Sequence, residues 1–165
     1  MDPMNKVSLK SQSTPIEADF ALWSAEQGAL LRAGKLDRLD RENLAEEIES
    51  LGRSERREIG SRLELLVLHL LKWQYQPGRR SESWRISISE QRIAIDEVIR
   101  TSPSLKRYPE EIFRQACERG RQRAIDETGM LESVFPHDPP FSVAQALDSR
   151  FLPGEPLTPW DVIRD

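Results

Sequence analysis

The sequence predicts an all-α protein: a helical bundle of about four main helices, one of them unusually long, followed by a loop-rich C-terminal segment. Two observations carry this prediction. Apolar residues recur every three or four positions through most of the chain, and residues 40–76 keep this period without a proline. Only one piece, SWRISIS at residues 83–89, alternates like a strand, and the helical period continues beyond it. We therefore expect helix there too.

The composition favours one soluble, cytoplasmic domain that does not contact a membrane. The chain has 165 residues, 38% of them hydrophobic, and a net charge of −4. No apolar run is long enough to span a bilayer, and no secretory signal is visible. The single cysteine, Cys117, excludes an internal disulfide and a cysteine-based zinc site. We expect a flexible leader at 1–15, one helical domain at 16–153 and a tail at 154–165.

The first helix is expected from about residue 17–19 to residue 33, because Gly34 is a typical helix end. One apolar stripe should face the core, formed by Phe20, Trp23, Leu30 and Leu31.

The long helix should begin after Asp40, a good N-cap, and stop at Pro77. Its stripe has one charged interruption at Glu55, close to Gly52, so the helix either bends there or carries a charged layer. Equal phase on both sides predicts continuity. About 35 residues would span about 50 Å, more than the roughly 30 Å of a domain this size. Part of the helix should therefore project or pair with another chain, for example in a homodimer. The stripe is Leu44, Ile48, Leu51, Ile59, Leu63, Leu66, Leu70 and Trp73.

Two more long helices and a short one should follow. The third is expected from residues 81–83 to just before Pro103, and the fourth from Ser104 as N-cap to Gly129, with Gly120 as a weak point. A short helix fits residues 142–148. The remaining C-terminal segment should be held on the bundle by Phe135, Phe141, Phe151, Leu152 and Trp160.

Several motifs together resemble a known bacterial family. LAEEIESLGRSERREI at 44–59 is followed by LELLVLHLLKWQYQP at 63–77 and RSESWRISISEQR at 80–92. With residues 19–44 upstream and PFSVAQALDSRFLP at 140–153, this combination resembles the family known as domain of unknown function twenty-nine. The resemblance implies an all-helical fold. It carries over no catalytic residue and no cofactor.

A cluster of acids begins the long helix: Glu42, Glu46, Glu47 and Glu49. Like charges three and four positions apart repel, which a bound metal or a basic partner would relieve. The alternative is a solvated helix start, favoured by the helix dipole. His69 is too far along one straight helix to join these acids, and no two-histidine metal motif is present. The sequence therefore assigns no metal site.

A second cluster combines cations and aromatic rings across the turn after the long helix. Residues 52–92 carry a net charge of +4 in an acidic chain. Such a cluster can form a packed corner, bind an anion or nucleic acid, or contact a protein. Its members are Trp73, Tyr75, Arg79, Arg80, Trp84, Arg85, Gln91 and Arg92.

No stretch of the sequence assigns a reaction. Nucleophile elbows, phosphate loops and zinc spacings are absent, and Cys117 lies in an apolar stripe. The favoured hypothesis is a non-enzymatic protein-interaction module whose partner is another protein or a second copy of the chain. One alternative is a nucleic-acid accessory protein that uses the basic region 53–92. The other is a metal-dependent hydrolase that uses the acids at 42–49.

Overall fold

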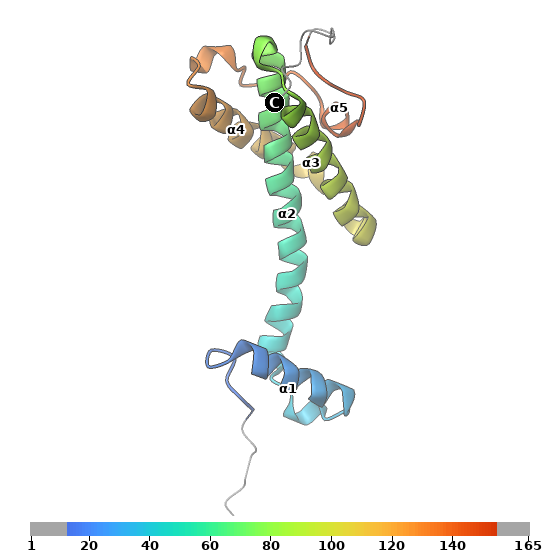
Figure 1. Ribbon diagram of the computed structural model, residues 1–165. Helices are drawn as coiled ribbons and strands as arrows, with labels where there is room; N and C mark the ends of the chain where they lie inside the picture. Colours follow the sequence, from blue (N-terminus) through green and yellow to red (C-terminus); the bar gives the residue numbers. More distant parts are fainter. Residues whose placement is uncertain (1–12, 155–165) are drawn as a thin grey trace, which may run out of the picture. The chain divides into compact units, whose positions relative to one another are not determined.

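The computed structural model describes residues 13–154, which form five α-helices and no strand (Figure 1). The all-α prediction is confirmed. The contacts divide the chain into two compact units, one up to Gly52 and one from Arg53 onward. We call their described parts the N-terminal unit (13–52) and the C-terminal unit (53–154). Most of the predicted leader, nearly all of the predicted tail, and Trp160 lie outside the described residues.

The N-terminal unit contains α1 (Phe20–Arg32), the 3₁₀ turn η1 (Leu36–Arg38) and the beginning of α2 (Arg41–Tyr75). Asp19 caps α1 by accepting the Leu22 N–H at 2.9 Å. At the other end Gly34 takes a left-handed φ of 68°. That conformation closes the helix and starts the turn towards η1, because glycine has no Cβ to clash there.

Asp40 joins α1 to the start of α2. Its Oδ2 accepts the Trp23 indole N–H at 3.1 Å, and its own backbone N–H donates to Gln27 Oε1 at 2.9 Å. The Asn43 side chain donates to the same Oδ2 at 2.7 Å. This hydrogen bond from Asn43 is the main reason that the pKa of Asp40 lies below its ordinary value. Trp23 and Gln27 are the buried residues of α1.

The long helix α2 is continuous from Arg41 to Tyr75, as predicted. Glu55, the interruption in its apolar stripe, accepts a hydrogen bond from the Ser102 hydroxyl at 2.6 Å. It is therefore a charged layer, because its carboxylate has a partner at the end of α3. After Tyr75 the chain turns through η2 (Pro77–Arg79).

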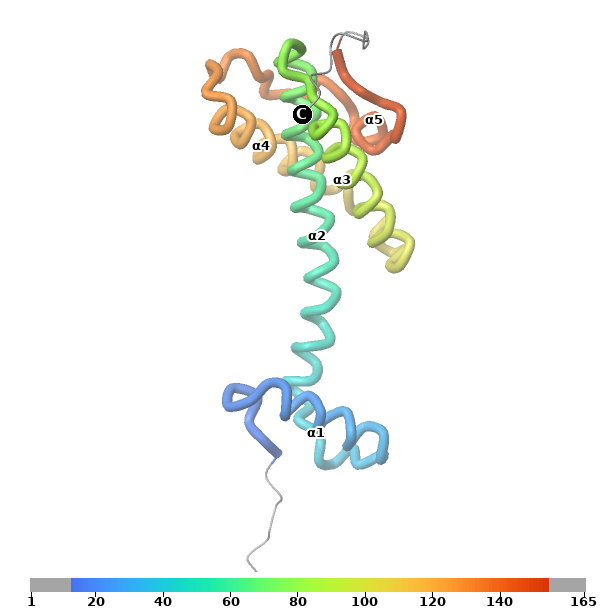
Figure 2. Tube along the Cα trace, viewed as in Figure 1, coloured from blue at the N-terminus to red at the C-terminus, as the bar shows by residue number. Residues whose placement is uncertain are grey.

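The C-terminal unit packs α3 (Glu82–Thr101), α4 (Tyr108–Thr128) and α5 (Val143–Leu147) with the second half of α2 (Figure 2). The turns η3 (Pro103–Leu105) and η4 (Glu132–Val134) connect them. Ser81 and Ser142 cap α3 and α5, and both helices begin where the sequence predicted. The core takes most of its large side chains from α2, and Phe135 and Phe141 of the C-terminal segment close it.

The fourth helix differs from its prediction. It begins at Tyr108 after Arg107, and Ser104 lies inside η3. A helix capped by Ser104 would place Pro109 where an N–H must bond to the preceding turn, and proline has none. Starting at Tyr108 puts Pro109 in the first turn, where no such bond is needed.

Gly120 is a site of close packing, whereas the sequence suggested only a weak point in α4. A Cβ at this position would lie 2.8 Å from Val67 Cγ1 and 2.9 Å from the Glu64 backbone oxygen. The absence of a side chain lets α4 approach α2 closely. Glycine is thus required here for packing.

The predicted apolar stripes are buried in one unit and largely exposed in the other. Within the C-terminal unit, Ile59, Leu63 and Trp73 are fully buried. In the N-terminal unit, Phe20 and Leu31 of α1 and Ile48 and Leu51 of α2 are exposed, contrary to the prediction. Helical spacing places residues on one face, but only a covering element buries them.

Candidate functional site

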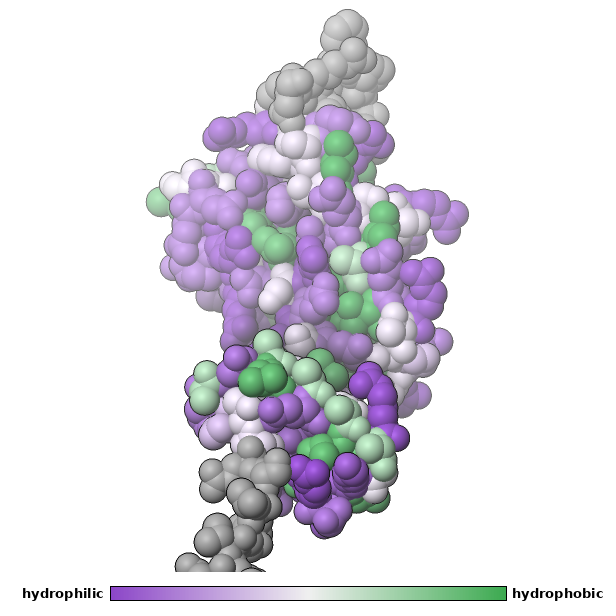
Figure 3. All heavy atoms as spheres, turned by 60° about the horizontal axis from the view of Figure 1, so that its bottom comes forward, coloured by the Kyte–Doolittle hydropathy of each residue, from purple (hydrophilic) through white to green (hydrophobic). Residues whose placement is uncertain are grey.

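The surface of the N-terminal unit is unusually apolar. Six large hydrophobic side chains there expose between 47% and 68% of their area, against three in the described C-terminal unit. In Figure 3 green apolar side chains interrupt the purple surface around α1. The six are Phe20, Leu22, Leu31, Leu36, Ile48 and Leu51.

This exposure follows from the size of the unit. About 40 residues form too small a body to enclose a full hydrophobic core. Trp23 fills the only large buried position in α1, and Gln27 beside it leaves its Nε2 without a hydrogen-bond partner. The remaining apolar side chains have nothing within the unit to cover them completely.

The predicted acidic cluster lies in the same unit. Glu42, Glu46, Glu47 and Glu49 are carried by the first turns of α2, and Ile48 lies among them at 65% exposure. Within residues 13–154, no three His, Cys, Asp or Glu side chains are grouped so that they could hold a metal ion. What the geometry does combine is negative charge with exposed apolar surface.

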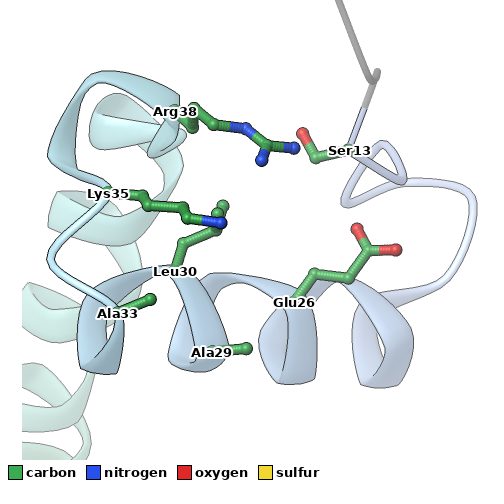
Figure 4. Close-up of a pocket in the computed structure, with 7 residues that line it drawn as sticks. All are labelled: Ser13, Glu26, Ala29, Leu30, Ala33, Lys35 and Arg38. Atoms are coloured by element: carbon green, nitrogen blue, oxygen red, sulfur yellow. The ribbon is translucent and has the colours of Figure 1, made fainter.

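A cavity of about 370 Å³ lies beside α1 (Figure 4). Ala29 and Leu30 of α1 and its C-cap residue Ala33 form the apolar wall, and Lys35 and Arg38 extend across it from the following turn. Ser13 and Glu26 stand opposite these two cations. No motif in the sequence indicated this cavity, because Lys35 and Arg38 reach it only through the turn that follows α1.

The predicted basic-aromatic cluster is divided between core and surface. Trp73, Arg80, Gln91 and Arg92 are buried, whereas Arg79 and Arg85 are exposed and Tyr75 and Trp84 are half-buried. The role of these residues in partner binding stays a prediction.

Arg80 holds the turn after α2 and the C-terminal segment together. Its Nε donates to the Trp73 backbone oxygen at 2.9 Å and its Nη2 to the Pro153 oxygen at 3.5 Å. The guanidinium also lies over the Trp73 ring, 5.2 Å from its centroid. A buried cation is tolerated here because carbonyl oxygens accept its N–H groups.

Arg92 makes a similar pair of contacts further along α3. Its Nε donates to the Ala146 oxygen at 2.8 Å and its Nη2 to the Phe151 oxygen at 2.7 Å. Burial lowers the pKa of this guanidinium from its ordinary value. Gln91 beside it accepts a hydrogen bond from Arg62 at 3.3 Å.

Arg121 is a third buried arginine, and it was not among the residues predicted from the sequence. Its Nε donates to the Phe135 oxygen at 2.8 Å, and its Nη2 donates to the Glu132 oxygen at 3.0 Å. A signal was available, because Arg121 interrupts the apolar stripe of α4 between Cys117 and Ala124. Arg80, Arg92 and Arg121 together fasten the proline-rich C-terminal segment through its backbone.

Half-buried Trp84 and exposed Arg85 have nearby partners. The Lys72 ammonium lies 4.6 Å from the centroid of the Trp84 ring. Arg85 forms an ion pair with Glu82 one turn earlier, and this hydrogen bond raises the pKa of Arg85. These contacts leave cationic and aromatic groups at the surface of α3 beside the turn.

His69 and Cys117 show no arrangement typical of catalysis. The Nδ1 of half-buried His69 lies 2.8 Å from the Leu65 backbone oxygen, one turn earlier in α2. Burial is the main cause that lowers the pKa of His69. Cys117 is buried, and this raises the pKa of its thiol to about 12. At neutral pH the thiol is protonated and a poor nucleophile.

The structure defines an all-α protein in which no group of His, Cys, Asp or Glu among the described residues could hold a metal ion. None of the described helices has both the length and the apolar content that crossing a membrane requires. Residues 16–152 match the family described as Domain of unknown function DUF29. The chain belongs to this family, as its motifs indicated. No curated protein and no solved structure matches it.

Proposed function

We propose that this protein is a protein-interaction module and that the exposed apolar side chains of the N-terminal unit are its docking surface. One observation carries the proposal. Six large hydrophobic side chains between Phe20 and Leu51 are exposed in a unit that buries only Trp23 and Gln27. Large apolar side chains left exposed together in one small unit are typical of a place where another protein binds.

The beginning of α2 offers the geometry for a docked helix. Ile48 and Leu51 are three positions apart and share a face of α2, with exposures of 65% and 68%. Half-buried Leu44 lies one turn before Ile48 on the same side. Apolar side chains at such spacing are the anchors onto which an amphipathic partner helix packs.

Charge specifies the kind of partner. The N-terminal unit holds nine Asp and Glu against four Lys and Arg. Four of these acids, Glu42, Glu46, Glu47 and Glu49, lie in the turns that carry Ile48. A helix with Leu or Ile on one face and Lys or Arg beside it would cover the apolar surface and meet the acids. Complementary charge of this kind raises association rates and specificity.

The magnitudes favour a modest affinity. Full burial of an Ile or Leu side chain contributes about 1.5–3 kcal/mol, so Ile48 and Leu51 together would supply several kcal/mol. Association costs at least about 4 kcal/mol in lost freedom of motion. The remaining exposed residues of α1, including Phe20 and Leu31, would have to add contacts for a stable complex.

The contacts of the basic region favour this proposal over nucleic-acid binding. Arg80 and Arg92, two of the cations on which that alternative relied, donate to backbone carbonyl oxygens of the C-terminal segment. Their N–H groups are then directed at protein, and an arginine held in this way contributes little to binding a phosphate backbone.

Site-specific photo-crosslinking in an extract of the source organism tests the proposal. A photoreactive residue replaces Ile48, and a matched control replaces Ile86, an exposed isoleucine of α3. We expect the probe at position 48 to crosslink to a helical segment rich in Lys and Arg, and the probe at 86 not to. The purified partner should lose at least about tenfold in affinity for Ile48→Asp, because a carboxylate replaces an anchor.

Every other result of the crosslinking experiment contradicts either the proposed partner or the proposed surface. Crosslinking to a second copy of this chain identifies a homodimer and overturns the choice of a cationic partner. Crosslinking to an acidic segment does the same. If the probes at 48 and 86 capture nothing, or capture the same proteins, the docking surface is wrong.

A further inference from the structure

The cavity beside α1 is built from three consecutive parts of the chain. Ser13 precedes the helix, Glu26 to Ala33 belong to α1 and its end, and Lys35 and Arg38 follow it. Its volume of about 370 Å³ falls in the range of cavities that bind small molecules. Figure 4 shows the polar ends of Lys35, Arg38, Ser13 and Glu26 around one space, above the apolar side chains of α1.

Local backbone structure places the two cations. The Gly34 N–H donates to the Leu31 oxygen at 3.1 Å, and the Lys35 N–H donates to the Leu30 oxygen at 3.0 Å. These two bonds reverse the chain at the end of α1, which Gly34 permits through its positive φ. Lys35 is thereby turned back over the helix.

Arg38 is brought to the same space by the next turn. Its backbone N–H donates to the Lys35 oxygen at 3.2 Å, within η1. One short turn thus carries both cations, three residues apart, on the side that faces α1 (Figure 4). Their spacing is set by hydrogen-bonded backbone and not by long loops.

The charges around the cavity are unequally satisfied. Thr14 donates its backbone N–H to Glu26 Oε2 at 2.8 Å and its hydroxyl to Oε1 at 3.0 Å, so both oxygens of this carboxylate accept hydrogen bonds. Lys35 and Arg38 make no side-chain hydrogen bond or ion pair with any residue in the described range. The lining therefore presents two available cations and one acid that is already hydrogen-bonded.

This concentration of positive charge contrasts with its surroundings. Only four Lys and Arg occur in the N-terminal unit, and two of them line this one cavity. Of its nine acids, only Glu26 does so. In an acidic unit such an arrangement selects an anion over a cation, because Lys and Arg donate charge-assisted hydrogen bonds to oxyanions.

We propose that this cavity binds a small organic oxyanion. Its carboxylate or phosphate group would lie between Lys35 and Arg38, and its apolar part would lie on Ala29, Leu30 and Ala33. The Ser13 hydroxyl, on the opposite wall, can donate a further hydrogen bond. This site is separate from the proposed docking of a protein and does not depend on it.

The test is a titration of the ¹⁵N-labelled full-length protein followed by NMR, at low ionic strength because exposed cations are screened by salt. The probes are benzoate, phenyl phosphate and inorganic phosphate. We expect saturable shifts of the Ser13, Ala29 and Ala33 amides with the two aromatic anions. Inorganic phosphate should bind at least about tenfold more weakly than phenyl phosphate, because it cannot use the apolar wall. Comparing benzoate with phenyl phosphate identifies the preferred head group.

Three variants give the control. Lys35→Gln with Arg38→Gln should weaken binding at least about tenfold. Ala33→Leu, which fills the cavity and keeps every charge, should also weaken the aromatic anions. Arg32→Gln removes one cation from the same unit without touching the lining and should change affinity by less than about twofold.

Two results would overturn the proposal. One is that Arg32→Gln weakens binding as much as the double variant does, since the anion would then respond only to overall charge. The other is that the wild-type amides do not shift up to saturating probe, or shift without regard to the cavity. Because partner crosslinking from position 48 is a different readout, failure of this site leaves the docking proposal testable, and the reverse holds too.

Discussion

The two units carry similar apolar patterns along α2, but the apolar side chains are buried in one unit and exposed in the other. In α2, Leu44, Ile48 and Leu51 continue the spacing of Ile59, Leu63 and Leu66. The second set is fully buried in the C-terminal unit, whereas Ile48 and Leu51 are exposed in the N-terminal unit. The difference is what surrounds each set, because α3, α4 and the C-terminal segment supply side chains to the second set. An apolar stripe is therefore buried only where other elements pack on it. Within residues 13–154 such elements cover the stripe of the C-terminal unit and leave Ile48 and Leu51 exposed.

The two units also differ in their polar contacts. In the C-terminal unit, buried arginine side chains donate hydrogen bonds to backbone oxygens. Arg80, Arg92 and Arg121 fasten a proline-rich segment by donating to its backbone oxygens. In the N-terminal unit the corresponding role falls to Asp40, a partly exposed carboxylate. Four predictions, from the largest expected effect to the smallest, test this contrast.

Arg92→Met should destabilise the protein most. It leaves the Ala146 and Phe151 oxygens without their donors, and each unsatisfied buried group costs about 1–3 kcal/mol. We expect a loss of about 3 kcal/mol in the free energy of unfolding, measured by urea denaturation. Arg100→Met, on the same helix but exposed, is the matched control and should change stability by less than about 0.5 kcal/mol. Equal effects would refute the role given to Arg92.

Gly120→Ala should follow with a loss of about 2 kcal/mol, because the new methyl group would meet Val67 and the Glu64 backbone oxygen. Gly52→Ala is its counterpart on α2, where a Cβ meets nothing within 4 Å. There the same substitution should stabilise the helix by about 0.5–1 kcal/mol. Thermal denaturation of both variants measures the contrast. The packing account fails if both shift stability in the same direction.

Asp40→Ala should cost about 1 kcal/mol locally, since α2 loses its cap and Trp23 loses its acceptor. The lowered pKa of Asp40 fixes the pH dependence. The ionised carboxylate stabilises the fold fully above its ordinary pKa of about 3.9, and this contribution is lost as pH falls below that value. Hydrogen exchange of the Asn43 and Leu44 amides reports the effect. Unchanged exchange at pH 6 would contradict it.

His69→Gln should give the smallest change. Burial lowers the pKa of His69, so the folded protein favours its neutral form. Stability is then undiminished above the ordinary pKa of about 6.5 and falls as the pH drops through the lower, folded-state pKa. The positive charges of Lys72 and Arg123 lower the pKa of His69 further, and the negative charge of Glu127 raises it. Urea denaturation at pH 7.5 and 5 should show a smaller loss for the variant. An identical loss would exclude His69 as its source.

The helices could be predicted because their signals are local. Ser81, Pro77 and Gly129 mark ends that the structure confirms, and the continuous phase on both sides of Glu55 predicted an unbroken α2. The start of α4 was wrong because the effect of Pro109 on the preceding turn outweighed a favourable cap at Ser104.

The functional surfaces could not be predicted in the same way, because their contacts join distant residues. Arg92 is 54 positions from its acceptor at Ala146, so its sequence neighbours say nothing of its burial. Exposure of Ile48 depends on the absence of a cover, which a helical period cannot express. The cavity of Lys35 and Arg38 depends on a chain reversal at Gly34, and the sequence identified that glycine only as a helix end.

Hydrogen exchange of the full-length protein alone, followed by mass spectrometry, tests most directly the claim that the N-terminal unit lacks a core of its own. The account predicts that amides of α1 (Phe20–Arg32) exchange at least about 100-fold faster, after correction for intrinsic rates, than those of α2 between Ile59 and Trp73. Addition of the crosslinked partner should slow α1 selectively. Equal protection of the two segments in the free protein would contradict the account.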